Sequence, residues 1–527
     1  MRFRFLALIL LGCVALTAPG RSETYDLVIR CGRVADGTGN PAYFADVAIR
    51  DGRIAALGRV AGDAAVEIDA KGLIVAPGFI DVHTHADEIA EQPTAEHFLR
   101  MGVTTVVAGN CGDSALDIAK AFREIEETRV CINFATLIGH GTVRGKAMGG
   151  SFNRPPTREE LEKMRGMVEQ AMKDGAVGLS TGLIYPPSVY GQTDEIIELA
   201  KVVARHDGIY ATHQRNEGTG IIGSLDEIIR IAREAGIRAE VSHIKLAGEK
   251  AWGRADEVLA HIEKARAEGL DITQDQYAYT ASSTGLSQLI PDDALEGGRE
   301  EFKKRLDDPA RKTKIVEGMR AKIHDRGRED YAYAVIASYR HDKSYNGLNI
   351  VEAARKMRGA DTLDDQIETI LEIQRNGGAS GVFHGMSEDD LQTFMRHPNT
   401  MVACDSGLRK LGEGVPHPRG YGNNARVLAR YVRELKVLRL EDAIRKMTSL
   451  PATTFRIEGR GLLREGNWAD IVVFDPAKVR DVSTFNDPHH YSEGFHHVLV
   501  NGVPVIKDGQ LTDARPGKVL RHGATGQ

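Results

Sequence analysis

Apolar and polar positions follow two different patterns along the chain, and the change of pattern divides it into parts. Near the N-terminus, short β-rich runs alternate with turns that contain Gly and Asp, as in "YDLVIRCGRVADGTGNPAYFADVAIRDGRIAALG". This texture is typical of a small antiparallel sheet, and it returns near the C-terminus in "GNWADIVVFDPAKV" and "HHVLVNGVPVIKDGQLT". We therefore expect the two ends of the chain to form one small β-domain.

The middle of the chain, from about residue 73 to residue 454, has a different pattern. Short apolar runs such as "TTVVAG", "GIYATH", "RAEVSH" and "NTMVACD" alternate with amphipathic stretches such as "TREELEKMRGMVEQAMKDG" and "SLDEIIRIAREAG". In these stretches apolar residues recur at helical spacing and Gly stands at the end. Repeated strand–helix alternation predicts a parallel sheet, either closed as a barrel or doubly wound.

A charged segment at about 292–345 interrupts this alternation. It contains "REEFKKRLDDPARKTKIVEGMRAKIHDRG", and its dense, mixed charges predict solvated helices. Two interpretations remain open. The segment is either a cover inserted over the mouth of the barrel or a pair of surface helices without a role at the site.

The first 22 residues differ from the rest of the chain. Arg2 and Arg4 precede an apolar run at 5–16, and small residues follow in "TAPGRSE". A basic start, a short apolar centre and a small-residue exit are the layout of a signal peptide, and the apolar run is too short for an ordinary transmembrane helix. We expect a soluble mature chain in the periplasm or outside the cell. The sequence "LLGC", which ends at Cys13, leaves a lipid anchor as an alternative.

Composition adds three limits to this organisation. The length of 527 residues favours two domains over one core. A net charge of -6 provides no footprint for nucleic acid or for an anionic membrane surface. Four cysteines remain after signal removal, too few for a disulfide framework in a chain of this size. Cys31, Cys131 and Cys404 lie in apolar runs and predict buried thiols, whereas Cys111 lies in the polar turn "GNCGDS".

Six polar side chains stand at or just past the ends of predicted strands, where barrel enzymes carry their chemistry. They are His83, His85, Cys111, His213, His243 and Asp405. Imidazoles with a thiolate favour zinc, or a similar metal, over Mg²⁺ or Ca²⁺. One such residue is more often a satisfied core or turn side chain. Six at equivalent strand ends predict a metal site.

These residues belong to motifs that resemble the amidohydrolase superfamily and, within it, the N-acyl-D-amino-acid deacylases, or D-aminoacylases. The resemblance covers essentially the whole mature chain and rests on "APGFIDVHTH", "GNCGDS", "LIGHGTVRG", "GAVGLSTGLIYPP", "YATHQRNE", "EVSHIKLAG", "YAYTASST", "CDSGL" and "HPRGYG". "DVHTH" alone marks only the superfamily. The cysteine of "GNCG", where many relatives use a carboxylated lysine, is more specific to the deacylases.

The resemblance implies an α/β fold, a TIM-like (β/α)8 barrel beside a small β-sandwich domain built from both chain ends. After a signal peptide at 1–22, the β-sandwich would take residues 23–75 and 456–527. The barrel would take residues 76–455 and contain the inserted segment at about 290–345.

The resemblance also implies roles for the thiol and for two of the imidazoles. Cys111, His213 and His243 match the ligands of one tightly bound zinc. Zinc polarises an amide carbonyl and lowers the pKa of bound water towards neutrality. A metal-bound thiolate is anionic, so Cys111 would need the metal to hold it deprotonated.

The other donors match a second, weaker zinc site. His83 and His85 supply it, and Cys111 and Asp405 help to complete it. Asp405 also matches the general acid/base, which would take a proton from the attacking water and give it to the departing nitrogen.

Substrate recognition follows from the same positions. Lys245, Tyr277, Ser283 and Arg419 match residues that bind the carboxylate of the acylated amino acid, and Tyr185 matches a residue that lines the same pocket. The residues themselves leave an alternative, in which Lys245 pairs with a neighbouring acid and Arg419 tethers its own loop.

The resemblance thus implies a metal-dependent amidohydrolase that cleaves linear N-acyl-D-amino acids, small molecules, into a carboxylate and a free D-amino acid. A dipeptidase that acts on dipeptides with a C-terminal D-residue would bind the same carboxylate and amide. A cyclic-amide hydrolase shares the barrel and the metal, but Lys245 and Arg419 argue against it. A nucleobase deaminase fits Cys111 poorly. A catalytically inactive scaffold would have lost some of the donors.

Overall fold

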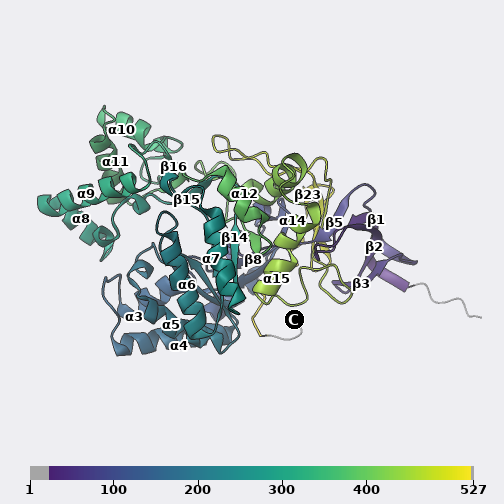
Figure 1. Cartoon of the computed structure of the whole chain (residues 1–527). Coiled ribbons are helices and arrows are strands. Elements are labelled where there is room, and N and C mark those ends of the chain that lie inside the picture. The colour runs from purple at the N-terminus through teal and green to yellow at the C-terminus, as the bar shows by residue number, and fades with distance from the viewer. Residues whose placement is uncertain (1–22, 524–527) are drawn as a thin grey trace, which may run out of the picture.

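The computed structural model describes residues 23–523 of the chain (Figure 1). The predicted signal peptide at residues 1–22, including Cys13, lies outside the described residues. Within the described part, no helix is both long and apolar enough to cross a membrane. The molecule consists of parallel strands covered by helices, a β-sheet made from both chain ends, and an inserted unit at the opposite end of the view. This arrangement matches the predicted α/β class.

The two chain ends form one nine-stranded sheet in the order β23-β22-β21-β20-β5-β1-β2-β3, with β4 paired to β1. Its strands are β1 (Glu23–Val34), β2 (Tyr43–Arg50), β3 (Arg53–Gly58), β4 (Gly62–Asp69), β5 (Ile74–Pro77), β20 (Ile471–Phe474), β21 (Phe495–Val500), β22 (Val503–Lys507) and β23 (Gln510–Leu511). The ends meet where β5 pairs antiparallel with β20, with Ala76 opposite Val472. Branched apolar side chains from both ends, among them Ile29, Val75 and Ile471, share one core.

One prediction fails in this sheet, because Cys31 is exposed rather than buried. The pairing of β1 with β2 shifts its register between Ile29 and Gly32, which marks a β-bulge. Cys31 lies in this bulge with a φ of 58°. A bulge adds a residue to one strand and changes the face to which the next side chains point, so the alternation that predicts burial no longer holds at this position.

The central strands form a ring of parallel segments. They are β6 (Phe79–Asp81), β7 (Thr84–His85), β8 (Val103–Ala108), β9 (Asn133–Thr136), β10 (Ile138–Gly139), β11 (Gly178–Gly182), β12 (Ile209–His213), β13 (Arg238–Val241), β14 (Ile272–Gln276), β18 (Thr400–Val402) and β19 (Ser406–Gly407). Parallel pairing runs from β6 to β9 and from β10 to β18. The pairing of β19 with β7 joins the last segment to the first, so the ring closes as a barrel.

Helices follow the barrel strands and cover the outside of the ring (Figure 1). They include α2 (Ile118–Thr128), α3 (His140–Met148), α4 (Arg158–Asp174), α5 (Thr193–Ala204), α6 (Ile221–Ala235), α7 (Ala255–Ala267), α12 (Glu388–Arg396), α13 (Arg419–Arg426), a π-helix (Val427–Glu434), α14 (Leu440–Met447) and α15 (Ser449–Thr454). α4 shows why the sequence pattern predicted these helices correctly. Thr157 and Glu160 form a capping box at its start, and Gly175 ends it with a φ of 105°.

An inserted unit lies between β14 and β18 of the barrel. It contains β15 (Ala281–Gly285), β16 (Ala334–Ser338), β17 (Ser380–His384), α8 (Arg299–Asp307), α9 (Pro309–Asp325), α10 (Ile350–Arg358) and α11 (Leu363–Arg375). β15 and β16 each pair antiparallel with β17. The unit has its own core, which includes Phe302, Met319 and Ile367. It extends on both sides of the charged segment at 292–345. The sequence did not predict this extension, because the small residues of β15 show no alternation of apolar and polar positions.

Candidate metal centre

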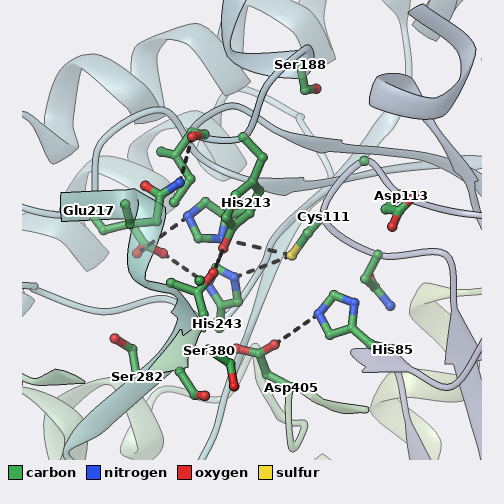
Figure 2. A pocket seen from close by; sticks show the side chains of 18 of the residues that line it. His85, Cys111, Asp113, Ser188, His213, Glu217, His243, Ser282, Ser380 and Asp405 are labelled. Carbon is green, nitrogen blue, oxygen red and sulfur yellow. Dashed lines mark hydrogen bonds and ion pairs between the residues drawn. The ribbon is translucent and has the colours of Figure 1, made fainter. Parts of the chain in front are cut away.

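Cys111 lies in the turn that follows β8, and its Sγ faces three imidazoles, of which Figure 2 shows those of His213 and His243. The Sγ is 3.4 Å from Nε2 of His83, 3.9 Å from Nδ1 of His213 and 3.8 Å from Nε2 of His243. Sulfur and nitrogen ligands of one tetrahedral zinc, at about 2.3 and 2.0 Å from the ion, lie about 3.5 Å from each other. The spacing and the donor types therefore fit the ligand shell of a zinc ion.

The backbone is held in unusual conformations at three of the predicted positions. Cys111, His243 and Asp405 have φ values of 55°, 37° and 50°, a region that residues other than Gly seldom adopt. They follow β8, β13 and β18 at the carboxyl edge of the barrel. Such conformations cluster at functional sites, where the surrounding structure holds them in place.

A second group of donors lies beside the first. Nε2 of His85 is 3.3 Å and Nε2 of His83 is 3.6 Å from Oδ1 of Asp405, and the three residues form a candidate metal-binding group. The pairing of β7 with β19 brings them together, because His85 stands opposite Gly407. All six predicted donors therefore meet at one place, and His83 lies between the two groups.

Electrostatics favour the ionised forms of the thiol and the carboxyl in this cluster. Burial alone would raise the pKa of Cys111, but the imidazoles of His83, His213 and His243 hold it well below the usual range. Burial would likewise raise the pKa of Asp405, yet nearby positive charge holds it well below normal. An anionic sulfur and an anionic carboxylate are suitable partners for a divalent cation.

The cluster opens into a pocket of about 660 Å³ between the barrel mouth and the inserted unit. Barrel residues that line it include Cys111, His213 and Asp405, and Figure 2 shows them pointing toward one another. The inserted unit contributes Ser282, Ser283, Thr284, Gln288, Arg326, Ser380 and Phe383. Of the two interpretations of the charged segment, the structure favours the cover, because Arg326 of this segment lines the pocket beside residues from the flanking parts of the inserted unit.

Comparison with known proteins agrees with this geometry. Residues 66–506 match the model of the amidohydrolase family. The chain belongs to the amidohydrolase family. It is 35% identical to the D-aminoacylase of Alcaligenes xylosoxydans xylosoxydans over 95% of this chain and 99% of that protein. It is 36% identical to the N-acyl-D-glutamate deacylase of the same organism, over 95% of this chain and 98% of that protein.

Solved structures support the same grouping. The N-acyl-D-glutamate deacylase of Bordetella bronchiseptica, complexed with zinc and a phosphonate inhibitor, superposes with a TM-score of 0.82 at 36% identity, over 95% of this chain and all of that chain. A D-aminoacylase structure superposes with a TM-score of 0.81 at 34% identity, over 94% and 100%. The resemblance inferred from the motifs, and the barrel fold that it implies, are confirmed.

In this amidohydrolase, the sequence did not reveal the role of Glu217. Its carboxylate oxygens lie 3.0 Å from Nδ1 of His243 and 3.7 Å from Nε2 of His213. A carboxylate on one ring nitrogen fixes the tautomer and directs the other nitrogen toward a metal. The other nitrogens of these two rings are the ones that face Cys111. The available signal was the spacing in "HQRNE", which places Glu217 four residues after His213.

Asp275 does the same for the third imidazole. It stands at the end of β14 and is 1% exposed. Its carboxylate lies 3.2 Å from Nδ1 of His83 and accepts a hydrogen bond of 3.0 Å from the backbone N–H of His243. Nε2 of His83 therefore points to Cys111. An acid within the strand "ITQDQ" was the available signal.

The predicted carboxylate-binding residues do not all reach the pocket. Tyr185, Lys245, Ser283 and Arg419 line it. Tyr277 is fully buried, with the guanidinium carbon of Arg419 4.5 Å from its ring centroid, and its hydroxyl donates to Sδ of Met386. The structure thus places Tyr277 beneath the cations, where it supports Arg419 and does not face the pocket.

Lys245 and Arg419 both contact acids. Nζ of Lys245 pairs with Glu217 and lies 2.7 Å from Nδ1 of His243, which is the pairing left open by the sequence. Arg419 is 2% exposed and pairs with Asp405 at 2.9 Å. Its Nε and Nη1 are buried without a hydrogen-bond partner. Because unsatisfied buried donors are costly, Arg419 is suited to bind an anion in the pocket.

Proposed function

We propose that this protein is a zinc-dependent hydrolase that cleaves the amide bond of N-acyl-D-amino acids and releases a carboxylate and a free D-amino acid. The observation that carries the proposal is the convergence of Cys111 and three imidazoles beside Asp405. The relatives named above, which act on N-acyl-D-amino acids by name, support the substrate class. One of their solved structures contains zinc.

The chemistry divides between the metal and the side chains. Cys111, His213 and His243 would hold a zinc ion, which would supply a Lewis acid for the amide carbonyl and for the attacking water. Asp405 is ionised, because Arg419 and the neighbouring imidazoles hold its pKa well below normal against the effect of burial. It accepts the proton of the attacking water and transfers it to the departing nitrogen.

Arg419 binds the α-carboxylate of the substrate in this proposal. Its guanidinium is a permanent cation that can donate hydrogen bonds to a carboxylate, and two of its nitrogens, Nε and Nη1, have no other partner. Ser283 and Tyr185 line the same pocket and offer hydroxyls, although each already bonds within the protein, to Gly381 and Thr284. Lys245 contributes positive charge and fixes Glu217.

A hydrolysis screen with the zinc-loaded protein tests the proposal. Paired N-acetyl-D- and N-acetyl-L-amino acids are supplied, and amine release is measured. We expect release from the D-series alone. Release from both series at equal rates would contradict the stereochemical assignment. Hydrolysis of hydantoins without release from acyl amino acids would favour the cyclic-amide alternative, and dipeptides with a C-terminal D-residue measure the dipeptidase alternative in the same assay.

We further propose that the chain is exported through its N-terminal signal peptide to the periplasm or the medium. The layout of residues 1–22 supports this, with a lipid anchor at Cys13 as the minor alternative. The mass and N-terminal sequence of the mature protein test it. Retention of Met1 in the cytosolic fraction would contradict export, and a lipid-modified Cys13 would favour the anchor.

A further inference from the structure

Not every cation that lines the pocket has a carboxylate partner. Three acids and four cations line it, namely Asp113, Glu217, Asp405, Lys245, Arg326, Arg409 and Arg419. Glu217 pairs with Lys245, and Asp405 pairs with Arg419. Asp113 is exposed and accepts a hydrogen bond from Thr142. Two guanidiniums, those of Arg326 and Arg409, therefore have no acidic partner within 4.0 Å among the described residues.

Arg409 is held in place by its stem rather than by an acid. It follows β19, and its Nε donates a hydrogen bond of 3.2 Å to Oγ of Ser406. The stem packs against Gly420 in α13, where an added Cβ would lie 3.1 Å from Cγ and 3.3 Å from Nε of Arg409. Among the described residues, no hydrogen bond reaches its two terminal nitrogens. The glycine leaves room for the arginine, and the terminal nitrogens remain available.

The surroundings of Arg409 favour an anionic ligand. Burial lowers the pKa of Arg409, and the positive charge of Arg419 lowers it further. A partly buried cation without a counterion is costly, and a bound carboxylate would offset that cost. Because Arg419 is already paired with the α-carboxylate in the proposed function, Arg409 is available for a second anion.

We propose that Arg409 binds a second carboxylate of the substrate, so that the preferred substrates are N-acyl-D-amino acids that carry a carboxylate in addition to the α-carboxylate. The inference rests on the proposed function and narrows its substrate class. The second carboxylate has two chemical sources, the side chain of an acidic D-amino acid or the far end of a dicarboxylic acyl group. A guanidinium fork recognises either one in the same way.

Arg326 provides a matched comparison in the same pocket. It follows α9 in the inserted unit, and its backbone oxygen accepts a hydrogen bond of 3.1 Å from the N–H of Glu249. It is half-buried and carries the same charge as Arg409. Replacement of either arginine by methionine removes one positive charge from the pocket. A difference between the two variants in substrate preference therefore reports direct contact with the substrate, and not the overall electrostatic potential of the pocket.

The test compares kcat/KM for charged and neutral substrates of the same shape on one preparation. N-acetyl-D-glutamate is paired with N-acetyl-D-glutamine, and N-succinyl-D-alanine with N-succinamoyl-D-alanine. For at least one pair, we expect the wild type to prefer the charged member about ten- to hundredfold, the range for a hydrogen bond to a charged group. Arg409→Met should bring that ratio close to one, and Arg326→Met should keep it within about threefold.

Each ratio is independent of the folded fraction, so a partly unfolded variant still gives an answer, and Arg409→Lys supplies a charged variant if the methionine variant does not fold. The pair that shows the preference identifies the source of the carboxylate. Equal rates within both pairs for the wild type would overturn the inference and leave the proposed function intact. Loss of the preference in Arg326→Met, with Arg409→Met unchanged, would also overturn it. Absence of hydrolysis with all four substrates would instead count against the proposed function.

Discussion

Two clusters of buried polar side chains join distant parts of this chain, and they differ in how their atoms are satisfied. The metal centre brings Cys111 and its imidazoles together at the carboxyl edge of the barrel. The interface network joins the barrel to the β-sheet of the chain ends through Asn133, Arg460, Asp470 and Asn501. The residues of the interface network are almost fully buried, whereas Cys111 is only partly buried and lines the pocket.

The interface network is closed on itself. Asp470 pairs with Arg460 and accepts hydrogen bonds from the side chain of Asn133 and the backbone of Asn501. Asn501 in turn accepts from Arg460 and donates to Asn133. In the metal centre the nitrogens that do not face Glu217 or Asp275 face the thiol instead. A network in which the buried polar groups satisfy one another stabilises the fold, whereas donors that converge on one point form a binding site for a metal ion.

The largest expected effect of a substitution in the metal centre is at Cys111. Cys111→Ala removes the anionic ligand, so we expect loss of bound zinc and a fall in turnover of at least about a thousandfold, or about 4 kcal/mol of transition-state stabilisation. Zinc per folded molecule and amine release are the measurements. Cys131→Ala, which alters a buried thiol elsewhere, should retain both. An active Cys111→Ala protein with zinc still bound would refute the ligand assignment.

The opposite phenotype is expected in the interface network. Asp470→Ala leaves the guanidinium of Arg460 buried without its partner, which should cost about 3–5 kcal/mol in the free energy of unfolding. The shift of the denaturation midpoint measures it. Asp487→Ala, on the surface, should change stability by less than about 0.5 kcal/mol. Zinc content per folded molecule should not change, because Asn133 begins β9 at the end of the barrel opposite to the donors. If Asp470→Ala lost zinc but kept its stability, the interface network would have a role in metal binding and not in folding, which would contradict the comparison.

The two clusters also differ in what the sequence could reveal. The donors of the metal centre were predictable, because each follows an apolar run of strand character and parallel strands bring such positions to one edge. Asp470 and Asn501 carry no comparable pattern, since their partners come from a strand and a turn far away in the sequence. The exposure of Cys31 depends on a bulge, and the burial of Tyr277 on the packing of Arg419 above it. Contacts between turns were beyond pattern and propensity alone.

Glu217 has features of both clusters. It contacts the ligand imidazoles of His213 and His243 but does not face Cys111. Glu217→Gln keeps the shape but weakens the hold on His213 and His243, so we expect zinc affinity to fall about 10- to 100-fold. Competition with a chelator measures the affinity. Glu227→Gln receives the same substitution at a carboxylate that pairs with Arg215, and it should keep the wild-type affinity. Equal zinc affinity in both variants would mean that Glu217 pairs with Lys245 but does not support the zinc ligands.

The smallest effect is expected at Arg419, which belongs partly to each kind of cluster. One nitrogen is satisfied by Asp405, as in a closed network, and two are unsatisfied, as at a ligand site. Arg419→Lys keeps the charge but replaces the planar fork with a point charge. We expect KM for N-acyl-D-amino acids to rise roughly tenfold, with a smaller fall in kcat if substrate positioning suffers. Zinc content should stay at the wild-type level, because Arg419 contacts none of the imidazoles that face Cys111. Unchanged kinetics would mean that Arg419 only holds Asp405 and Ser283 in place. Other residues would then bind the substrate carboxylate.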